Sequence, residues 1–307
     1  MDTWLVTGAS GFLGANAGLF LAGKSVSTVG LSRGVATPPH FETALRGDLR
    51  EPELLAEKVR ESRPNVILHA GALASHEQCE ADPSLATRIN ADATRALASV
   101  AAEIGATFIF ISTDAVFDGI RGGYNEEDEP NPFSVYGATK LRGEQYALQE
   151  YPDALIIRTN FFGWSPTGSR SILEFFVNSL ASGARVNGYT DFTVTSTYTQ
   201  FLIDSIWQLA QQRTTGVVHV ASADKCSKYE FATTVAEVFG LDASLISPVE
   251  AAAATHATSR ARDLSLRVEK LESLIGTQAP PQIAGILRAY EDSGTIRAEL
   301  TEGRLQA

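Results

Sequence analysis

The stretch TWLVTGASGFLG, residues 3–14, joins an apolar segment to a glycine-rich turn and the first residues of a helix. Its glycines, Gly8, Gly11 and Gly14, follow a GxxGxxG spacing. Glycine permits turn conformations that other residues resist, and its missing side chain lets the backbone approach a pyrophosphate. The following helix would direct its N-terminal N–H groups at the phosphates. Because this is the first strand-to-helix turn of the chain, it predicts a dinucleotide-binding fold.

Outward from this turn, residues 1–160 alternate apolar strands with helices, which predicts an α/β fold with a Rossmann-type, doubly wound parallel sheet. We expect residues 1–160 to form the dinucleotide-binding domain, with a strand near 216–221 returning to it. Residues 161–307 are expected to form mainly a smaller, C-terminal substrate-binding lobe. Within that lobe, residues 186–204 are expected to mix turns with short strands. A long helix is expected to start near Asp82-Pro83.

Composition and charge narrow the range of partners. The 307 residues carry a net charge of −11, which argues against a broad nucleic-acid-binding surface. No apolar run approaches the roughly 18 residues that a membrane helix needs. The first residues do not resemble a signal peptide, so a cytoplasmic location is expected. Two cysteines and five scattered histidines do not follow any metal-ligand spacing, and we expect no metal site.

The end of the second predicted strand bears on the choice of cofactor. An acidic residue about 20 positions after the glycines would hold the ribose 2′-hydroxyl of NAD. The segment here ends in Ser32-Arg33 instead, and these side chains can receive a 2′-phosphate. The alternative is an ordinary surface arginine. We therefore expect NADP(H), with NAD(H) as the second possibility, and we place Asp48-Leu49 beside the adenine.

The stretch VYGATKLRGE, residues 135–144, places Tyr136 and Lys140 four residues apart. On a helix this spacing puts both side chains on one face, one turn apart. A phenol beside an ammonium packs poorly, but the positive charge eases release of the phenolic proton. A chance pair on a helix surface is the alternative. Together with the glycine turn, the pair indicates a site for proton transfer.

Several motifs together resemble the extended short-chain dehydrogenase/reductase family, and within it the dTDP-4-dehydrorhamnose reductase-like, sugar-nucleotide-binding proteins. They are TGASGFLG, HAGALAS, RIN, STDAVFDG, PNPFSVYGATK and IIRTNFFG. The resemblance covers nearly the whole chain and is most specific between residues 107 and 145. It implies an NADPH-dependent ketoreductase that acts on a nucleotide-activated 4-keto sugar or a similar polar ketone. It also implies cofactor contacts from the residues Ser10, Phe12, Leu13, Ala70, Gly71 and Ala72.

The resemblance further implies roles at the reacting centre. Tyr136 would donate the proton, Lys140 would hold the nicotinamide ribose, and Thr113 would hydrogen-bond the substrate carbonyl. Asn90 is expected to order a water or a backbone group near Lys140.

On the substrate side, the resemblance points to Asp114, Asn160 and Phe161, the last in place of a tryptophan that such reductases often have. Arg260 and Arg262 can pair with a diphosphate or lie on the surface.

Other activities of the superfamily remain as alternatives. Sugar-nucleotide dehydratases typically have a glutamate after the Asp114 position, where this chain has Ala115, so dehydration is not expected. An epimerase would need another acid or base, for which His76 is the candidate, although a polar loop residue is the simpler interpretation. A non-catalytic, NADP-binding subunit like the regulatory subunit of methionine adenosyltransferase is a further alternative. A homodimer through the helices at 82–104 and 134–150 is also possible, by analogy with relatives.

Overall fold

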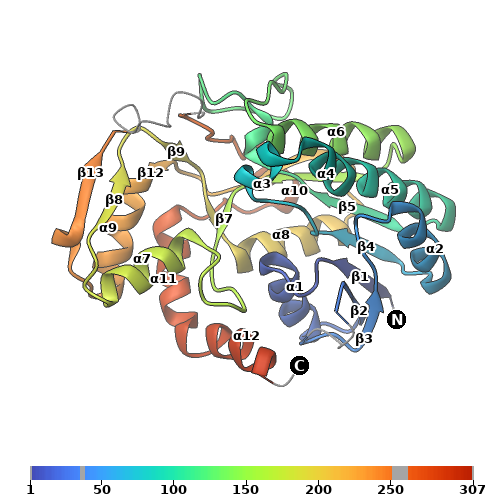
Figure 1. Ribbon diagram of the computed structural model, residues 1–307, viewed down its shortest axis with the longest axis horizontal. Coiled ribbons are helices and arrows are strands. Elements are labelled where there is room, and N and C mark those ends of the chain that lie inside the picture. The colour runs from blue at the N-terminus through green and yellow to red at the C-terminus, as the bar shows by residue number, and fades with distance from the viewer. Residues whose placement is uncertain (1, 35–38, 251–261, 306–307) are drawn as a thin grey trace.

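A seven-stranded parallel sheet lies at the centre of the computed structural model, which describes residues 2–34, 39–250 and 262–305 (Figure 1). The strand order is β11-β6-β5-β4-β1-β2-β3, so the chain moves outward from β1 in both directions. This arrangement confirms the predicted α/β, Rossmann-type fold. The strands of this sheet are β1 (Thr3–Thr7), β2 (Ser27–Ser32), β3 (Thr43–Arg46), β4 (Val66–His69), β5 (Thr107–Ile111), β6 (Leu155–Thr159) and β11 (Gly216–Val220).

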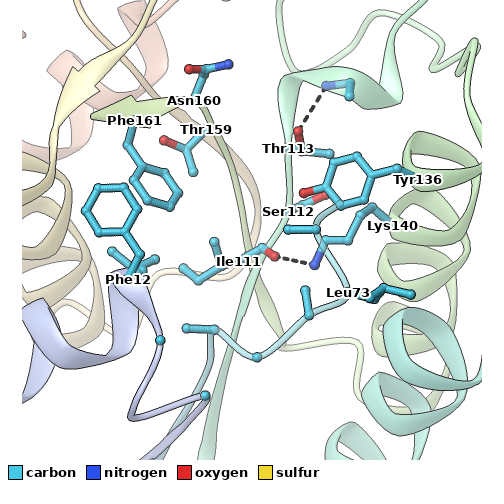
Figure 2. A pocket seen from close by; sticks show the side chains of 18 of the residues that line it. Phe12, Leu73, Ile111, Ser112, Thr113, Tyr136, Lys140, Thr159, Asn160 and Phe161 are labelled. Carbon is cyan, nitrogen blue, oxygen red and sulfur yellow. Dashed lines mark hydrogen bonds between the residues drawn. The ribbon is translucent and has the colours of Figure 1, made fainter. Parts of the chain in front are cut away.

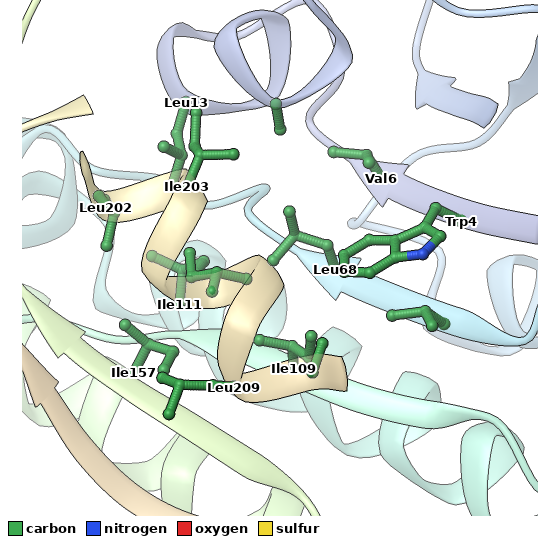
Figure 3. Close-up of a cluster of buried hydrophobic side chains, with 14 of the residues drawn as sticks. Trp4, Val6, Leu13, Leu68, Ile109, Ile111, Ile157, Leu202, Ile203 and Leu209 are labelled. Carbon is green, nitrogen blue, oxygen red and sulfur yellow. The ribbon is translucent and has the colours of Figure 1, made fainter. Parts of the chain in front are cut away.

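Helices cover both faces of the sheet because the inner strands are apolar on both sides. Alternate residues of β5 point to opposite faces: Ile109 and Ile111 belong to one core cluster, and Phe108 and Phe110 to another. Figure 3 shows the first cluster, in which Leu202 and Leu209 of α8 lie over the strands. Helices α1 (Phe12–Ala22), α8 (Thr199–Gln211) and α10 (Glu269–Ile275) cover that face, and α2 (Pro52–Ser62), α5 (Ala93–Ile104) and α6 (Val135–Glu150) cover the other.

The helical segment between β4 and β5 is interrupted, although the sequence predicts one long helix there. Asp82 accepts a hydrogen bond from the Leu85 N–H at 2.9 Å and caps the segment, and Pro83 is its first residue. A π-helical turn, Arg88–Asp92, then separates α4 (Pro83–Thr87) from α5. The extra residue of such a turn often marks a functional position, and here the turn contains Asn90.

The C-terminal lobe packs around a second apolar core and overhangs the carboxyl edge of the sheet (Figure 1). The lobe contains the helices α7 (Ile172–Ala181), α9 (Lys228–Phe239), α11 (Gln282–Glu291) and α12 (Ile296–Leu305). The short helix α3 (His76–Ala81) belongs to the first half of the chain and precedes α4. Its short strands pair as β7 (Phe161–Phe162) with β10 (Thr197–Tyr198), β9 (Thr193–Val194) with β12 (Cys226–Ser227), and β8 (Val186–Tyr189) with β13 (Ile246–Val249).

The lobe differs from the sequence prediction in two places. The segment 186–204 contains the expected short strands, but helix α8 begins at Thr199, so the prediction of turns and strands to residue 204 is wrong at its end. The sequence also gave no expectation for α11 and α12, whose apolar stripes pack on distant elements. In the described ranges, no helix has the length and apolar character needed to cross a bilayer.

Candidate active site

A cavity of about 910 Å³ opens at the carboxyl ends of the parallel strands. It lies beside β1, which has β2 on one side and β4 on the other, at the point where the strand order reverses; this is the usual ligand position in such sheets. The loop after β1 and the exits of β4, β5 and β6 form its floor and walls, and parts of the C-terminal lobe close its far side. The described residues contain no group of three or more His, Cys, Asp or Glu side chains that could hold a metal ion.

The glycine turn is built for close backbone approach. Gly8 has φ +68°, and a Cβ atom there would lie 2.7 Å from the Gly71 Cα atom. A Cβ on Gly14 would lie 2.2 Å from the Gly8 carbonyl oxygen, so Gly14 supports the turn from behind rather than lining the cavity. Gly11 is the N-cap of α1 and offers no side chain to satisfy the first N–H groups of that helix. The turn thus fits an anionic diphosphate, together with the lining residues Ser10, Phe12 and Leu13.

The wall beyond the glycine turn carries the expected basic group. Ser32 and Arg33 line the cavity at the exit of β2, together with Asp48 and Leu49 after β3. The Asp48 carboxylate is engaged by Arg50, whose Nε atom lies 2.9 Å from Asp48 Oδ2. This ion pair lowers the pKa of Asp48. Because Asp48 is already paired, the Arg33 guanidinium gives this wall a net attraction for anions.

Tyr136 and Lys140 face the cavity from the first turns of α6, as the spacing predicts (Figure 2). Ser134 caps the helix by accepting a hydrogen bond from the Gly137 N–H at 3.1 Å. Lys140 Nζ donates to the Ile111 carbonyl oxygen at 2.6 Å and lies 3.9 Å from the centroid of the Phe110 ring. Burial lowers the pKa of Lys140 to about 7.

The electrostatics of the tyrosine differ from the expectation. Burial raises the pKa of Tyr136, and the hydrogen bond with Thr113 opposes that rise only in part. The ammonium of Lys140 is directed to β5 instead of acting as the main influence on the phenol. The physical reason is that burial penalises the phenolate and the nearby Asp114 charge disfavours it further, and the Thr113 hydrogen bond offsets only part of this. Tyr136 therefore keeps its proton at neutral pH in this structure.

Thr113, Asp114 and Asn160 form a connected network at the exits of β5 and β6. The Thr113 hydroxyl donates to Asp114 Oδ1 at 3.0 Å, and Asn160 Nδ2 donates to Asp114 Oδ2 at 2.8 Å. Ser196, from the C-terminal lobe, donates to Asn160 Oδ1 at 2.6 Å. Burial raises the pKa of Asp114 to about 6 despite these hydrogen bonds. All four residues line the cavity.

Two phenylalanines pack against each other on the side of the cavity opposite Tyr136. Figure 2 shows Phe12, at the start of α1, beside Phe161, the first residue of β7. Their ring centroids are 5.2 Å apart, and the planes are tilted by 50°. Phe161 therefore offers an aromatic surface at the place predicted for the sugar, but part of that surface packs against Phe12.

Asn90 acts through the backbone of a neighbouring loop. Its Oδ1 atom accepts from the Leu73 N–H at 2.8 Å, and its Nδ2 atom donates to the Leu73 carbonyl at 3.1 Å and to Thr139 Oγ1 at 3.1 Å. Of the two expected roles, the structure thus shows a backbone group held in place. Asn90 does not line the cavity, whereas Leu73 does, as do Ala70, Gly71 and Ala72 of the same loop.

Arg262 does not lie where the sequence interpretation placed it. Its side chain is exposed, its Nη1 atom is 4.0 Å from Asp191 Oδ2, and it is not among the residues that line the cavity. The Arg262 N–H donates to the Gly119 carbonyl, in the loop that follows β5, and this contact holds Arg262 outside the cavity lining. Arg260 lies outside the described residues.

The lobe contributes cationic and aromatic lining residues that the sequence interpretation missed. Arg170 and Lys228 line the cavity, and Lys228 Nζ lies 4.3 Å from the centroid of the Phe192 ring. Both cations lie at helix starts in which a serine forms a capping box, before α7 and at the start of α9. The capping patterns were visible in the sequence, but their position over the sheet edge depends on tertiary packing. His76 also lines the cavity, with its ring centroid 4.9 Å from that of Tyr136.

Comparisons with known proteins agree with this geometry. The family model described as "RmlD substrate binding domain" matches residues 2–294. A probable low-salt glycan biosynthesis reductase of Haloferax volcanii is 31% identical over 296 residues, covering 94% of this chain and 98% of that protein. Methionine adenosyltransferase 2 subunit beta of Mus musculus is 30% identical, covering 90% and 84% of the two chains. A crystal structure of dTDP-4-dehydrorhamnose reductase from Bacillus anthracis in complex with NADP matches with a TM-score of 0.83 and 25% identity, covering 95% of this chain and 100% of that one.

Proposed function

The chain belongs to the RmlD substrate binding domain family, and from this premise we propose that it is an NADPH-dependent reductase of a keto group on a nucleotide-activated sugar. The observation that carries the proposal is the convergence of Tyr136, Lys140 and Thr113 on one cavity that also contains the glycine turn. A proton donor beside a dinucleotide cradle is what ketone reduction requires.

The residues present fit the dinucleotide. Gly8 and Gly11 form a cradle that a Cβ atom would obstruct, and the first N–H groups of α1 face the position of a diphosphate. Ser32 and Arg33 would receive a 2′-phosphate, which favours NADP(H) over NAD(H). The solved relative from Bacillus anthracis was crystallised with NADP. Lys140 keeps two N–H donors beyond its bond to Ile111 for the nicotinamide ribose.

In the proposed reaction, Tyr136 supplies the proton, and Lys140 assists it. When bound, NADPH would supply the hydride that reduces the carbonyl carbon. Tyr136 delivers its proton to the carbonyl oxygen as negative charge develops there, so that the products are an alcohol and a tyrosinate that regains a proton from water. The raised pKa of Tyr136 keeps the donor protonated before reaction. The attraction between the Lys140 ammonium and the Tyr136 oxygen grows as the tyrosinate forms, because opposite charges attract strongly in a buried site.

The substrate side of the cavity suits a polar, anionic ligand. Asp114 and Asn160 offer hydrogen bonds to sugar hydroxyls, and Phe161 offers an apolar face. Arg170 and Lys228 would replace Arg262 as the partners of a diphosphate, since they line the cavity. Ala115 stands where dehydratases have a glutamate, and this favours reduction without loss of water.

The match to methionine adenosyltransferase 2 subunit beta supports a second candidate, a subunit that binds the cofactor and acts on a partner enzyme without turnover of its own. The position of His76 against Tyr136 supports a third, an epimerase with a second acid-base group. A homodimer through residues 82–104 and 134–150 and a cytoplasmic location stay predictions.

A substrate panel tests these candidates. Purified protein is mixed with NADPH and nucleotide-linked 4-keto sugars, and the absorbance of the reduced nicotinamide is followed. Consumption at a rate that depends on the sugar supports the reductase. Cofactor binding without consumption, together with copurification of a methionine adenosyltransferase catalytic subunit, would favour the regulatory subunit. Conversion of a sugar to its epimer without net consumption would favour the epimerase.

A further inference from the structure

The chain leaving β5 is fastened to α6 by three consecutive residues, each of which meets a different turn of the helix. The first contact seats a lysine against a backbone carbonyl, the second joins a serine to a buried carboxylate, and the third joins a threonine to the phenol. The pairs are Ile111 with Lys140, Ser112 with Glu144, and Thr113 with Tyr136. The proposed chemistry uses the first and third contacts, but not the second.

Both carboxylate oxygens of Glu144 accept hydrogen bonds from buried side chains. Ser112 Oγ donates to its Oε1 atom, and Arg158 on β6 donates from Nε to Oε1 at 3.0 Å and from Nη2 to Oε2 at 2.7 Å. The side chains of Arg158 and Glu144 are only 5% and 3% exposed. A buried ion pair of this kind contributes little net stability, because desolvation of both charges offsets their attraction.

The position of Glu144 relative to Lys140 suggests that role. The two residues lie four apart on α6, so their side chains share one face of the helix. Lys140 is 2% exposed, and a buried ammonium without a counter-charge loses its proton. Burial lowers the pKa of Lys140 to about 7, and the charge of Glu144 opposes that fall.

The other titratable groups around this pair do not supply negative charge to the lysine. His69 on β4 lies between the Thr7 and Thr94 hydroxyls, and burial keeps it neutral by lowering its pKa to about 3. His219 on β11, paired in register with Arg158, is kept neutral in the same way. Tyr136 retains its proton, and the Asp114 carboxylate faces Thr113 and Asn160. Arg158 itself is a cation, and it would repel the Lys140 ammonium if the negative charge of Glu144 did not compensate it.

We propose that Glu144, anchored by Ser112 and Arg158, is a positioning residue that keeps Lys140 charged and seated against the exit of β5. The effect of Glu144 on catalysis rests on the proposed reductase function, since the charge of Lys140 assists Tyr136 only in that reaction. The charge of Lys140 itself is a property of the protein without cofactor or substrate.

The test is a Glu144→Gln variant, which keeps the shape of the side chain and removes its charge. Protein labelled with ¹³C at the lysine Cε atoms is titrated by NMR, and a Lys140→Met variant identifies the Lys140 signal. We expect the titration midpoint of Lys140 to fall by about one unit in the variant. Turnover at pH 7 should then fall roughly fivefold through kcat, and lowering the pH should restore much of it, while KM for the ketone changes little.

Two further variants make the result decisive. Glu150→Gln removes a partly exposed carboxylate at the far end of the same helix, where it pairs with Arg95 at 2.7 Å, and should leave the Lys140 midpoint unchanged. If Glu144→Gln does not fold because Arg158 is left unpaired, the Glu144→Gln/Arg158→Met double variant replaces it. Its midpoint should lie below that of the wild type, by less than one unit, since the cation of Arg158 is removed together with the anion of Glu144.

A Lys140 midpoint that is unchanged in the folded Glu144 variants would overturn the inference, whatever the enzyme reduces. Lack of turnover by the wild type on every ketone would instead contradict the proposed function and leave the NMR result standing. The two failures are therefore separate.

Discussion

The Thr113 hydroxyl donates its hydrogen bond to Asp114 Oδ1 across 3.0 Å, so the group expected to hold a substrate oxygen is engaged by its own neighbour. The Thr113 Oγ1 atom also accepts a hydrogen bond from the Ala115 N–H at 3.2 Å. A hydroxyl has a single proton to donate. Thr113 can therefore serve a substrate only by releasing Asp114, or when Asp114 is protonated and itself donates to Thr113. The protonation state of Asp114 thus matters to the site.

This carboxyl group should leave a signature in the pH dependence of stability. Its pKa is raised from 3.8 to about 6 by burial, so the folded state binds its proton more tightly than the unfolded state does. Its contribution to stability is then fully present below 3.8 and is lost as the pH rises through about 6. Relative to an Asp114→Asn variant, the wild type should lose about 2 kcal/mol of unfolding free energy between pH 4 and pH 7.

Urea unfolding of both proteins at four pH values between 4 and 7 measures this difference directly. A constant difference across that range would show that Asp114 titrates normally. Comparison with the variant cancels the contributions of the other carboxylates.

Replacing Tyr136 by phenylalanine should remove the proton donor and keep the fold. The ring lies on the first turn of α6, and its hydroxyl is hydrogen-bonded with Thr113, so loss of one oxygen leaves the packing against His76 in place. We expect kcat to fall by about 10² to 10⁴ while NADPH affinity stays within about twofold. Stopped-flow turnover and NADPH fluorescence titration measure the two quantities. Full activity in this variant would assign the proton to another group.

The sequence predicted the parts of the site that depend on local spacing. Gly8, Gly11 and Gly14 belong to one turn, and Tyr136 and Lys140 belong to one helix, so residue intervals fix their geometry. The parallel sheet followed from apolar strands that alternate with helices, and the resemblance to a family agreed with both. None of these needed knowledge of which distant segments meet.

What the sequence could not predict depends on the register between distant segments. The bond from Lys140 to Ile111 and the ion pair between Glu144 and Arg158 arise from how α6 packs over β5 and β6. The lobe residue Lys228 reaches the cavity through the pairing of β12 with β9, which no local pattern shows. Arg262 was expected there from its place before the DLSL stretch of the family resemblance, and the structure leaves it outside the cavity lining.

Because the backbone behind the glycine turn is tightly packed, adding one methyl group at Gly14 should reduce both stability and NADPH affinity. A Cβ atom at position 14 would lie 2.2 Å from the Gly8 carbonyl oxygen, a contact that the backbone must move to relieve. Gly14→Ala should therefore cost about 2 kcal/mol of stability and weaken NADPH binding roughly tenfold. Gly23→Ala, just after the same helix, meets the Phe20 carbonyl at an ordinary 3.5 Å and is the control. Equal behaviour of the two variants in thermal unfolding and NADPH titration would contradict this account.

The choice between the two nicotinamide cofactors should depend on one arginine at the exit of β2. Arg33 lines the cavity and is close enough to Asp48 for its charge to lower the pKa of that carboxyl, so it can equally attract a 2′-phosphate. A charge-assisted hydrogen bond of about 1.5–3 kcal/mol corresponds to roughly 10- to 100-fold in affinity. Arg33→Ala should weaken NADPH binding by that factor and leave NADH binding nearly unchanged, as fluorescence titration of both cofactors would measure. Arg262→Ala, a change at an exposed arginine outside the cavity lining, should alter neither. If Arg33→Ala keeps the wild-type ratio of the two affinities, the 2′-phosphate is held elsewhere, and Arg50 of the same wall becomes the next residue to change.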